Sequence, residues 1–391
     1  MTTAGTQFPT NQRLVTDSDN VQLDAILDHL VRAVQLTQTQ HEDARQKYGA
    51  VGRWLSAENS DVRAFDPQIF PQGSLLIDTT VRPWARSEFD LDLVCLLLVA
   101  MGMPTPEQAY ELLWSRMSEH ETYRGIIEPC PRCIRINYAG DFHLDIVPAI
   151  PDPAGGGTAL LIPDRERRVW LPSNPKGYAA WFEEMARLPL EKKHTLGATI
   201  EPLRAPEPAA VKPPLKLAVQ LFKRWRDVAF SVRKEAPPPS IVLTTIAGHV
   251  YRKESHVTDA LRAILTATLA WSYRDLSALT NPANPREPIC ERWLAAPGAY
   301  EAFRDELAAF AEAWRTLVQY GTFPVLGTEL MRLFGEEPVK LALKAYDGAI
   351  AKAREEGSLR AVAKTGTLVT GGATPGLRVP AHTFFGGPRG K

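Results

Sequence analysis

The sequence has little cysteine and no excess of charge of either sign. Its 391 residues include four cysteines, Cys95, Cys130, Cys133 and Cys290, which are too few and too scattered for a disulfide framework. The 45 basic side chains balance the 45 acidic ones, so no global field attracts the protein to nucleic acid or to an anionic membrane. We therefore expect neither a disulfide scaffold nor a stable nucleic-acid partner.

Long hydrophobic runs are also missing. No apolar stretch approaches the length that spans a bilayer, and residues 1–20 lack the basic-then-apolar order of a secretory signal. We expect a cytoplasmic protein with no membrane partner. The chain is longer than a single hydrophobic core usually supports, which favours two lobes around a shared cleft.

The spacing of hydrophobic residues differs between regions of the chain. From Val21 to about Leu55, apolar residues recur at three- and four-residue steps, which predicts one long amphipathic helix. Between about Phe65 and Ile150, short apolar runs broken by Pro, Gly and Asp are typical of a sheet with one or two covering helices. Helical spacing returns after the proline-rich segment 201–214, in the candidate helices 214–231, 240–252, 257–275, 296–319, 327–333 and 337–355.

These patterns predict an α+β protein with three segments. Residues 1–205 form a core with a mixed sheet and the N-terminal long helix, and residues 206–355 form a mostly helical lobe that closes over a cleft. Residues 356–391 are rich in glycine and proline and lack a repeating apolar face, which is typical of a tail.

Two carboxylates stand in the most informative stretch, residues 88–97. Side chains alternate across a strand, so Asp90 and Asp92 lie together on one face. Such a pair repels itself beside an apolar core unless a divalent cation compensates the charge, and Mg²⁺ prefers these oxygen ligands. An edge strand with a solvated acidic face is the alternative, which this stretch alone leaves open.

A third carboxylate, Asp145, lies in the second of two alternating runs, 133–138 and 142–147. A short glycine-containing link joins the runs, which predicts a β-hairpin. If the hairpin extends the sheet beside Asp90 and Asp92, the three carboxylates hold two metal ions roughly 3.5–4 Å apart. Asp145 would then serve as a ligand and as a general base.

The dipeptide Gly73-Ser74 follows a short apolar run and precedes three bulky apolar residues, which predicts a turn at the start of a helix. Glycine lets the backbone approach a phosphate, serine adds a hydroxyl, and a helix N-terminus supplies oriented N–H groups. Most Gly-Ser pairs are ordinary turns. The place of this pair shortly before the Asp90 strand indicates a triphosphate cradle.

The order Gly73-Ser74, then Asp90-x-Asp92, then Asp145 defines the polymerase-β-like nucleotidyltransferase superfamily. A closer resemblance is carried by PQGSLLIDTTVRP, EFDLDLVCLL, FHLDIVPAI, LAVQLFKRWRD, SIVLTTIAGHVY and NPANPREPICERW. Together these segments resemble the bacterial cGAS/DncV-like nucleotidyltransferases over roughly residues 20–355. The resemblance implies a polymerase-β-like nucleotidyltransferase lobe with a mixed sheet, and a helical lobe that closes the nucleotide cleft.

The resemblance also implies roles for single residues. The catalytic, metal-binding triad matches Asp90, Asp92 and Asp145, and the phosphate-binding turn matches Gln72, Gly73 and Ser74. In such enzymes a lysine and a serine reach the donor triphosphate. Lys223 and Ser240 occupy comparable positions in this sequence.

The implied activity is synthesis of a cyclic di- or trinucleotide second messenger from ATP and/or GTP, with release of pyrophosphate, as the signal in bacterial antiphage defence. The implied cofactors are two Mg²⁺ or Mn²⁺ ions. The implied partners are an effector that binds the product and an E1/E2-like protein that conjugates the C-terminus. Composition and spacing do not show cyclisation and leave bases, linkage and ring size open. Linear transfer to RNA or protein, and an inactive nucleotide-binding sensor, are the alternatives.

Three further features receive ordinary interpretations. Cys130-x-x-Cys133 has the spacing of half a zinc site, but no second pair follows and a closed site usually needs four protein ligands, so we predict a turn. The run 223–226 is interpreted as one triphosphate contact plus a solvated helix face. We expect His143 to point away from the carboxylates.

Overall fold

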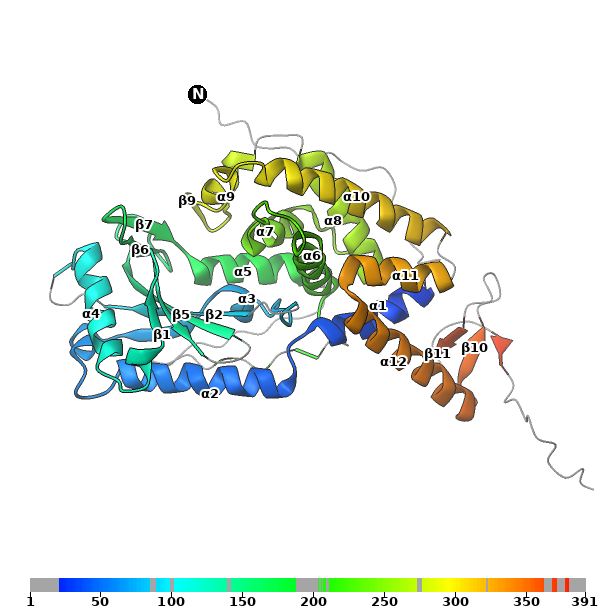
Figure 1. The fold of residues 1–391 in the computed structure, drawn as a ribbon, viewed down its shortest axis with the longest axis horizontal. Coiled ribbons are helices and arrows are strands. Elements are labelled where there is room, and N and C mark those ends of the chain that lie inside the picture. Colours follow the sequence, from blue (N-terminus) through cyan, green and yellow to red (C-terminus); the bar gives the residue numbers. More distant parts are fainter. Residues whose placement is uncertain are drawn as a thin grey trace, which may run out of the picture.

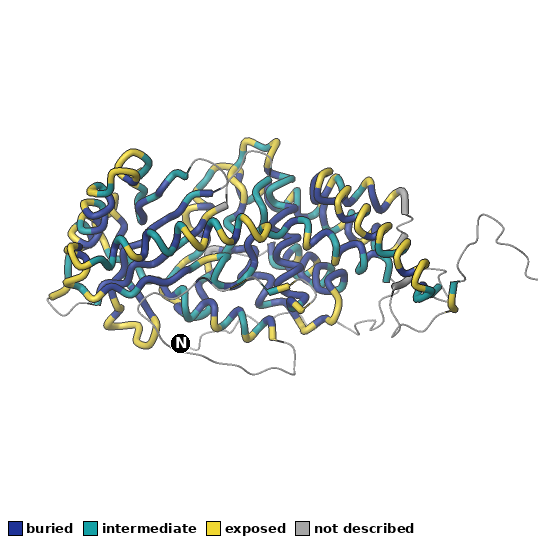
Figure 2. The backbone as a smooth tube through the Cα atoms, turned by 90° about the horizontal axis from the view of Figure 1, so that it is seen from below, coloured by how far each residue is buried: buried dark blue, intermediate teal, exposed yellow. Residues whose placement is uncertain are grey.

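The computed structural model describes residues 21–84, 89–98, 102–138, 142–187, 203, 205, 207–208, 211–272, 276–320, 323–361, 368–370 and 377–379. A sheet-bearing part and a helical part face each other across a cleft (Figure 1). Each part has its own hydrophobic core. Figure 2 shows buried segments in both parts, with exposed residues on the outer turns and helix faces. Among the described residues, no helix has the length and apolar character needed to cross a membrane.

The main sheet is mixed and has the strand order β1-β2-β5-β4-β3. These strands are β1 (Gln68–Pro71), β2 (Phe89–Leu96), β5 (Phe142–Pro151), β4 (Ile134–Asn137) and β3 (Ile127–Pro129). β2 and β5 are parallel, whereas the other neighbours in this order are antiparallel. The predicted hairpin is confirmed, because β4 and β5 pair as antiparallel neighbours. The far end of β5 also pairs with a second hairpin, β6 (Leu160–Asp164) and β7 (Val169–Ser173).

One face of this sheet is covered by helices and the other faces the cleft. Leu91, Leu93 and Cys95 alternate along β2 and are fully buried in a core with residues of α2 (Gln38–Leu55) and α4 (Pro106–Ser118). Figure 1 shows α2 running beneath the strands. Because side chains alternate, the residues between these apolar ones project from the opposite face.

The long helix predicted from Val21 to about Leu55 is two helices, and the prediction of one is wrong. α1 (Val21–Val34) packs with α12 (Glu336–Glu355) in the helical core, whereas α2 packs under the sheet. A capping box at Thr37 begins α2, which satisfies the first backbone N–H groups and lets the chain change direction. Apolar spacing of three and four continues on both sides of Thr37, so periodicity hides the break.

The six predicted helices of the second half are confirmed. They are α6 (Pro214–Phe230), α7 (Ser240–Val250), α8 (Val257–Trp271), α10 (Ala299–Tyr320), α11 (Phe323–Phe334) and α12. Shorter elements complete this part and its junction with the sheet: α3 (Gly73–Leu76), α5 (Pro175–Ala186), α9 (Glu291–Leu294), β8 (Thr280–Asn281), β9 (Asn284–Pro288), and 3-10 turns at Asp61–Phe65, Tyr123–Gly125 and Leu276–Ala278. α6 is the central helix, since nearly every residue of its first three turns is buried.

The segment 356–391 is more than the plain tail expected from its composition. β10 (Leu359–Ala361) pairs with β11 (Leu368–Thr370) and with β12 (Leu377–Arg378) in a small antiparallel sheet, which lies beside the end of α12 (Figure 1). Strands of two or three residues have too few alternating positions to be recognised from a sequence. Residues 380–391 lie outside the described residues.

Candidate active site

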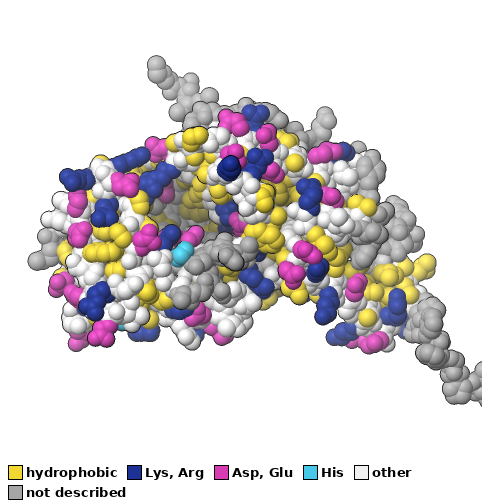
Figure 3. Space-filling model, viewed as in Figure 1, with side chains coloured by type: hydrophobic (Ala, Val, Ile, Leu, Met, Phe, Trp, Pro, Cys, Tyr) yellow, Lys and Arg dark blue, Asp and Glu magenta, His cyan; other side chains and the backbone are white. Residues whose placement is uncertain are grey.

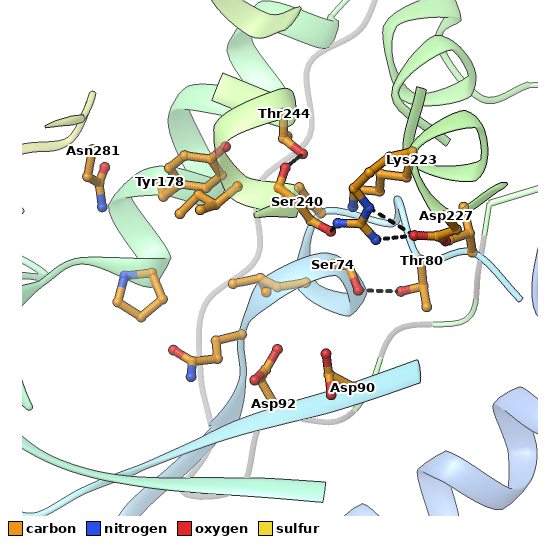
Figure 4. A pocket seen from close by; sticks show the side chains of 18 of the residues that line it. Ser74, Thr80, Asp90, Asp92, Tyr178, Lys223, Asp227, Ser240, Thr244 and Asn281 are labelled. Atoms are coloured by element: carbon orange, nitrogen blue, oxygen red, sulfur yellow. Dashed lines mark hydrogen bonds and ion pairs between the residues drawn. The ribbon is translucent and has the colours of Figure 1, made fainter. Parts of the chain in front are cut away.

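A cleft of about 440 Å³ separates the sheet from the helices. Figure 3 shows the molecule hollowed at this place. One wall, called here the sheet wall, consists of α3, β2 and its parallel neighbour β5, and the opposite helix wall is formed by α6 and α7 (Figure 4). Side chains from both walls line the cleft, so a bound molecule can contact both.

The sheet wall brings together the three carboxylates that the sequence singled out. Asp90 and Asp92 leave one face of β2 and line the cleft. Asp92 is the register partner of Asp145 on the parallel neighbour β5, so these side chains leave the same face of adjacent strands. The arrangement predicted for the hairpin and the Asp90 strand is therefore present.

Arg135, from β4, occupies the Asp145 carboxylate. Its Nε donates to Asp145 Oδ1 at 2.8 Å and its Nη2 donates to Oδ2 at 2.7 Å, and the same Nη2 lies 4.0 Å from Asp90 Oδ1. A two-pronged ion pair of this kind is strong and directional. Within the described ranges, no group of three or more His, Cys, Asp or Glu side chains is arranged to hold a metal ion, and Arg135 contacts both oxygens of Asp145.

Sequence reasoning missed Arg135, although a signal was available. Strand alternation places Arg135 on the same face of the hairpin as Asp145, and the two are register partners. His143 was also misplaced, because residues two apart in a strand share a face. His143 is the register partner of Asp90, and its charge lowers the pKa of that carboxyl. The expectation that His143 points away from the carboxylates is wrong.

The carboxylates of the sheet wall are electrostatically strained. Burial raises the pKa of Asp92 to about 7, and repulsion from Asp90 and Asp145 adds to this effect. Burial and Asp145 also raise the pKa of Asp90, whereas Arg135 lowers it. The Asp90 side chain is 63% exposed, so water in the cleft moderates its shift. Hard carboxylate oxygens that lack full compensation fit a divalent cation such as Mg²⁺ or Mn²⁺.

The turn at Gly73 is pressed against these carboxylates. The backbone N–H of Gln72, the residue before α3, donates to Asp92 O at 2.9 Å. Gly73 has φ +63°, and a Cβ at this position would clash with the Asp92 carboxylate, so only glycine allows this approach. The hydroxyl of Ser74 lies 2.9 Å from that of Thr80, above the carboxylates (Figure 4). The predicted turn and helix start are therefore present at the cleft.

Lys223 and Ser240 both line the cleft on the helix wall. The Lys223 ammonium donates to Thr79 O at 3.2 Å and to Thr79 Oγ1 at 2.8 Å. Burial lowers the pKa of Lys223 to about 7, and the positive charge of Arg226 contributes. Ser240 is the first residue of α7, and its hydroxyl accepts a hydrogen bond from Arg226 Nη1 at 2.6 Å. The structure thus places both predicted residues opposite the carboxylates.

The run 223–226 does not have the solvated face that we expected. Arg224 is 2% exposed and Trp225 is 2% exposed, because α6 is surrounded by other helices and by the segment after α3. Arg226 lines the cleft together with Asp227, to which it is bonded. A single amphipathic period does not reveal that a helix is buried on more than one side.

The end of the cleft away from Lys223 has an aromatic ring and several polar groups (Figure 4). Tyr178, from α5, donates to or accepts from Thr245 Oγ1 at 3.0 Å. Glu287 receives hydrogen bonds from Ser173 Oγ at 3.2 Å and from Asn281 Nδ2 at 2.7 Å. A ring beside donors and acceptors suits a nucleobase. Isolated residues of this kind carry no signal in the sequence.

The Cys130-x-x-Cys133 segment is the turn that we predicted. The backbone N–H of Cys130 donates to Cys133 O at 3.0 Å, which closes the turn before β4. All four cysteines are free thiols.

Comparison with known proteins places these features in a family. The model of the SMODS family, described as Second Messenger Oligonucleotide or Dinucleotide Synthetase domain, matches residues 21–185. A c-di-GMP synthase of Roseivirga ehrenbergii is 31% identical over 95% of this chain and 100% of its own length. The cyclic dinucleotide synthase CdnG of Bradyrhizobium diazoefficiens is 26% identical over 86% of this chain and 87% of that protein.

The fold agrees with a solved structure of the same group. The structure of Bradyrhizobium diazoefficiens CdnG in complex with GTP superposes with a TM-score of 0.66 at 24% sequence identity, over 83% of this chain and 99% of that one. The shared fold, the matched domain and the near full-length relative agree with the order of the turn and carboxylates. The chain belongs to the bacterial cGAS/DncV-like nucleotidyltransferases.

Proposed function

We propose that this protein joins two nucleoside triphosphates, at least one of them GTP, into a cyclic dinucleotide second messenger and releases pyrophosphate. The observation that carries the proposal is that Asp90 and Asp92 line the cleft beside the Gly73-Ser74 turn, with Asp145 as the register partner of Asp92 on the adjacent strand. The names of the two relatives, a c-di-GMP synthase and a cyclic dinucleotide synthase, favour a dinucleotide over a larger ring. A signal of this class acts through an effector that binds it, here in antiphage defence.

The metal requirement belongs to this proposal. The family is metal-dependent in general, and we assign two Mg²⁺ or Mn²⁺ ions to Asp90, Asp92 and Asp145. Bound ions of this kind acidify an attacking hydroxyl and neutralise charge on the transferred phosphate. The raised pKa of Asp92 is the reason for the assignment, because a buried carboxylate with acidic neighbours gains most from a nearby cation.

The residues of the chain bind and orient the reactants. The Gly73-Ser74 turn presents backbone N–H groups and a hydroxyl to the phosphates of the donor nucleotide. Asp145 accepts the proton of the attacking ribose hydroxyl at a carboxylate oxygen. Arg135 orients this carboxylate, since its Nε and Nη2 each donate to one of the two Asp145 oxygens.

The two ends of the cleft have different tasks in this proposal. The carboxylate end carries out the transfer, and the end lined by Tyr178 and Asn281 holds a base. Cyclisation needs the same transfer twice, with the first product rebound so that its remaining hydroxyl faces the carboxylates. Lys223 and Ser240, on the helix wall, are assigned to the donor triphosphate.

The test is a product assay with purified protein. The protein is incubated with labelled ATP, GTP, CTP and UTP in Mg²⁺ or Mn²⁺, treated with phosphatase and analysed by chromatography and mass spectrometry. We expect a phosphatase-resistant product that contains guanine and is absent for Asp90→Ala/Asp92→Ala. A product that phosphatase degrades would replace the proposal with linear transfer. A resistant product from the double variant would remove the carboxylates from the mechanism.

The predicted E1/E2-like partner would act on the C-terminus. That prediction falls on residues 380–391, outside the described residues, and stays a proposal. Mass spectrometry of the protein purified from its native host would show a conjugate as a mass addition at Lys391 or at the terminal carboxylate.

A further inference from the structure

The segment Asp78–Arg82, called here the strap, follows α3 and is held by side chains of α6 and of one residue just before it. Each of these side chains donates to a backbone carbonyl of the strap: Lys212 to Asp78 O at 3.2 Å, Lys223 to Thr79 O at 3.2 Å, Gln220 to Thr80 O at 2.8 Å and Arg224 to Arg82 O at 2.6 Å. Four of the five strap residues thus accept a hydrogen bond from α6 or from Lys212 at their backbone carbonyls.

These contacts are buried, so each polar group in them needs a hydrogen-bond partner. Lys212, Gln220, Lys223 and Arg224 are between 1% and 5% exposed. Buried polar groups are stable only when they are paired, so the helix and the strap fit in one register. Within α6, positions 220, 223 and 224 are one to four residues apart and all donate to the strap, so they share one face of the helix.

The strap connects these buried hydrogen bonds to the Gly73-Ser74 turn. The hydroxyl of Thr80 lies 2.9 Å from the hydroxyl of Ser74, and the backbone N–H of Thr79 donates to Ser74 O at 2.9 Å. Ser74 is therefore fixed by the strap through both its side chain and its carbonyl. A hydroxyl that must meet a phosphate gains affinity when its orientation is set in advance.

Gln220 stands at the centre of this arrangement. Its Nε2 donates to Thr80 O, and its Oε1 accepts from Gln35 Nε2 at 3.0 Å, just after α1. Thr80 lines the active-site cleft, and both Thr80 and Gln220 line a second cavity of about 330 Å³. The strap thus forms part of the partition between the two cavities, and Gln220 contacts it from the second one.

We propose that Gln220 is a positioning residue for the triphosphate: it holds Thr80, and through Thr80 it orients the Ser74 hydroxyl toward the phosphates. The inference rests on the proposed function, which places an NTP on the Gly73-Ser74 turn. Gln220 acts only through Thr80, so its removal weakens the contact with phosphates and leaves the contact with the base intact.

The experiment compares GTP and GMP, which share a base and ribose but differ in the phosphates that the turn would bind. Dissociation constants are measured by calorimetry in Mg²⁺, with the GTP carrying a methylene bridge between its α- and β-phosphates so that it cannot be transferred. The parent protein is compared with Gln220→Met, which keeps the side-chain length and removes both polar groups. We expect GTP binding to weaken about tenfold, the equivalent of one lost hydrogen bond, while GMP binding changes less than about twofold.

Two further variants separate positioning from general damage. Thr80→Val removes the hydroxyl link to Ser74 and keeps the backbone carbonyl, so it should weaken GTP binding by a similar factor, and Thr80→Ser should restore it. Gln35→Met removes only the other hydrogen bond of Gln220 and should leave the GTP/GMP ratio unchanged. The double variant Gln220→Met/Thr80→Val should be no weaker than either single variant, because both act through Ser74.

The dissociation constants for GTP and GMP distinguish a positioning role of Gln220 from a structural one. Equal losses for GTP and GMP would make Gln220 merely structural, and an unchanged GTP constant would remove it from the site. If the parent protein binds GTP no better than GMP, the assignment of the turn fails, and this inference fails with it. If Gln220→Met does not fold, as judged by its thermal transition, the Thr80→Val and Thr80→Ser pair decides alone.

Discussion

The sheet wall and the helix wall of the cleft carry charge in opposite ways. Asp90, Asp92 and Asp145 on the sheet wall crowd one another, and Arg135 compensates only part of their charge. Lys216, Lys223 and Arg224 of α6 are buried, and each is bonded to a backbone carbonyl or a carboxylate. Uncompensated carboxylates indicate where a cation binds, whereas compensated cations indicate side chains that are fixed in position before a ligand enters. The predictions below test this difference.

The largest effect is expected from Asp92→Asn. If Asp92 holds a metal ion as proposed, loss of its carboxylate should lower product formation about a thousandfold. The same change removes a strained charge, so in metal-free buffer at pH 8 the melting temperature should rise by about 2–4 °C, equivalent to about 1 kcal/mol. Scanning calorimetry and the product assay check both parts. An inactive variant that also melts lower would contradict the idea that the sheet wall is strained.

A second test uses the close contact between Gly73 and Asp92. Gly73→Ala adds a Cβ that clashes with the Asp92 carboxylate and strains a positive φ, so we expect about a hundredfold lower kcat/KM. Gly156 has nearly the same φ, +64°, with no atom within 4 Å of an added Cβ, so Gly156→Ala isolates the backbone strain. That control should lose about 1 kcal/mol of stability and keep its activity. Equal activity losses would point to strain rather than to the contact.

The two walls also differ in how much the sequence reveals. The sheet wall depends on local rules: alternation puts Asp90 and Asp92 on one face, and a hairpin brings Asp145 beside them. The same rules, applied fully, would have placed Arg135 and His143 there too. The Gly73-Ser74 turn, to which we assign phosphate binding, was recognisable because glycine and serine have distinct physical uses.

The helix wall depends on contacts distant in sequence, which periodicity does not encode. Helical spacing predicted the position of α6 within one residue, but the bond from Gln220 to Thr80 spans 140 positions. The burial of Arg224 has the same cause, because the strap that covers it lies far away in the sequence. The fold class and the six longer helices of this lobe were therefore predictable, whereas the buried hydrogen bonds between α6 and the strap were not.

A third prediction concerns competition at Asp145. Arg135 donates to both oxygens of that carboxylate, so its positive charge opposes a metal ion bound at Asp145. Arg135→Gln should therefore bind Mn²⁺ about tenfold more tightly, as measured by electron paramagnetic resonance, and should form less product. Arg135→Lys keeps the charge without the fork and should fall between the two. Weaker Mn²⁺ binding by both variants would show that Arg135 supports the metal site instead of competing for it.

The stability of the two walls should depend on pH with opposite signs. The pKa of Asp92 is raised from 3.8 to about 7, so its contribution to stability is present at low pH and is lost as the pH rises to 7. The pKa of Lys223 is lowered from 10.5 to about 7, so the folded protein gains stability from this group as the pH rises from 7 to about 10. Both windows apply without metal.

Urea unfolding at several pH values measures this difference. Between pH 5 and 7 the free energy of unfolding of Asp92→Asn should increase relative to the parent protein. Between pH 7 and 9 that of Lys223→Met should decrease relative to the parent. Parallel pH profiles for parent and variants would mean that the two groups have ordinary pKa values.

The smallest effect is expected where the two walls are joined, at Thr37. Its capping box begins α2, which supports the sheet, directly after α1, which belongs to the helical core. Thr37→Ala removes the cap and should lower the free energy of unfolding by about 1 kcal/mol. Thr105 has the same capping box at the start of α4, inside the sheet-bearing part, so Thr105→Ala is its matched control. If the joint only connects two walls that act independently, both variants lose similar stability and keep their GTP affinity. If Thr37→Ala alone weakens GTP binding, the joint sets the spacing of the cleft, and the walls are coupled through α1 as well as through the strap.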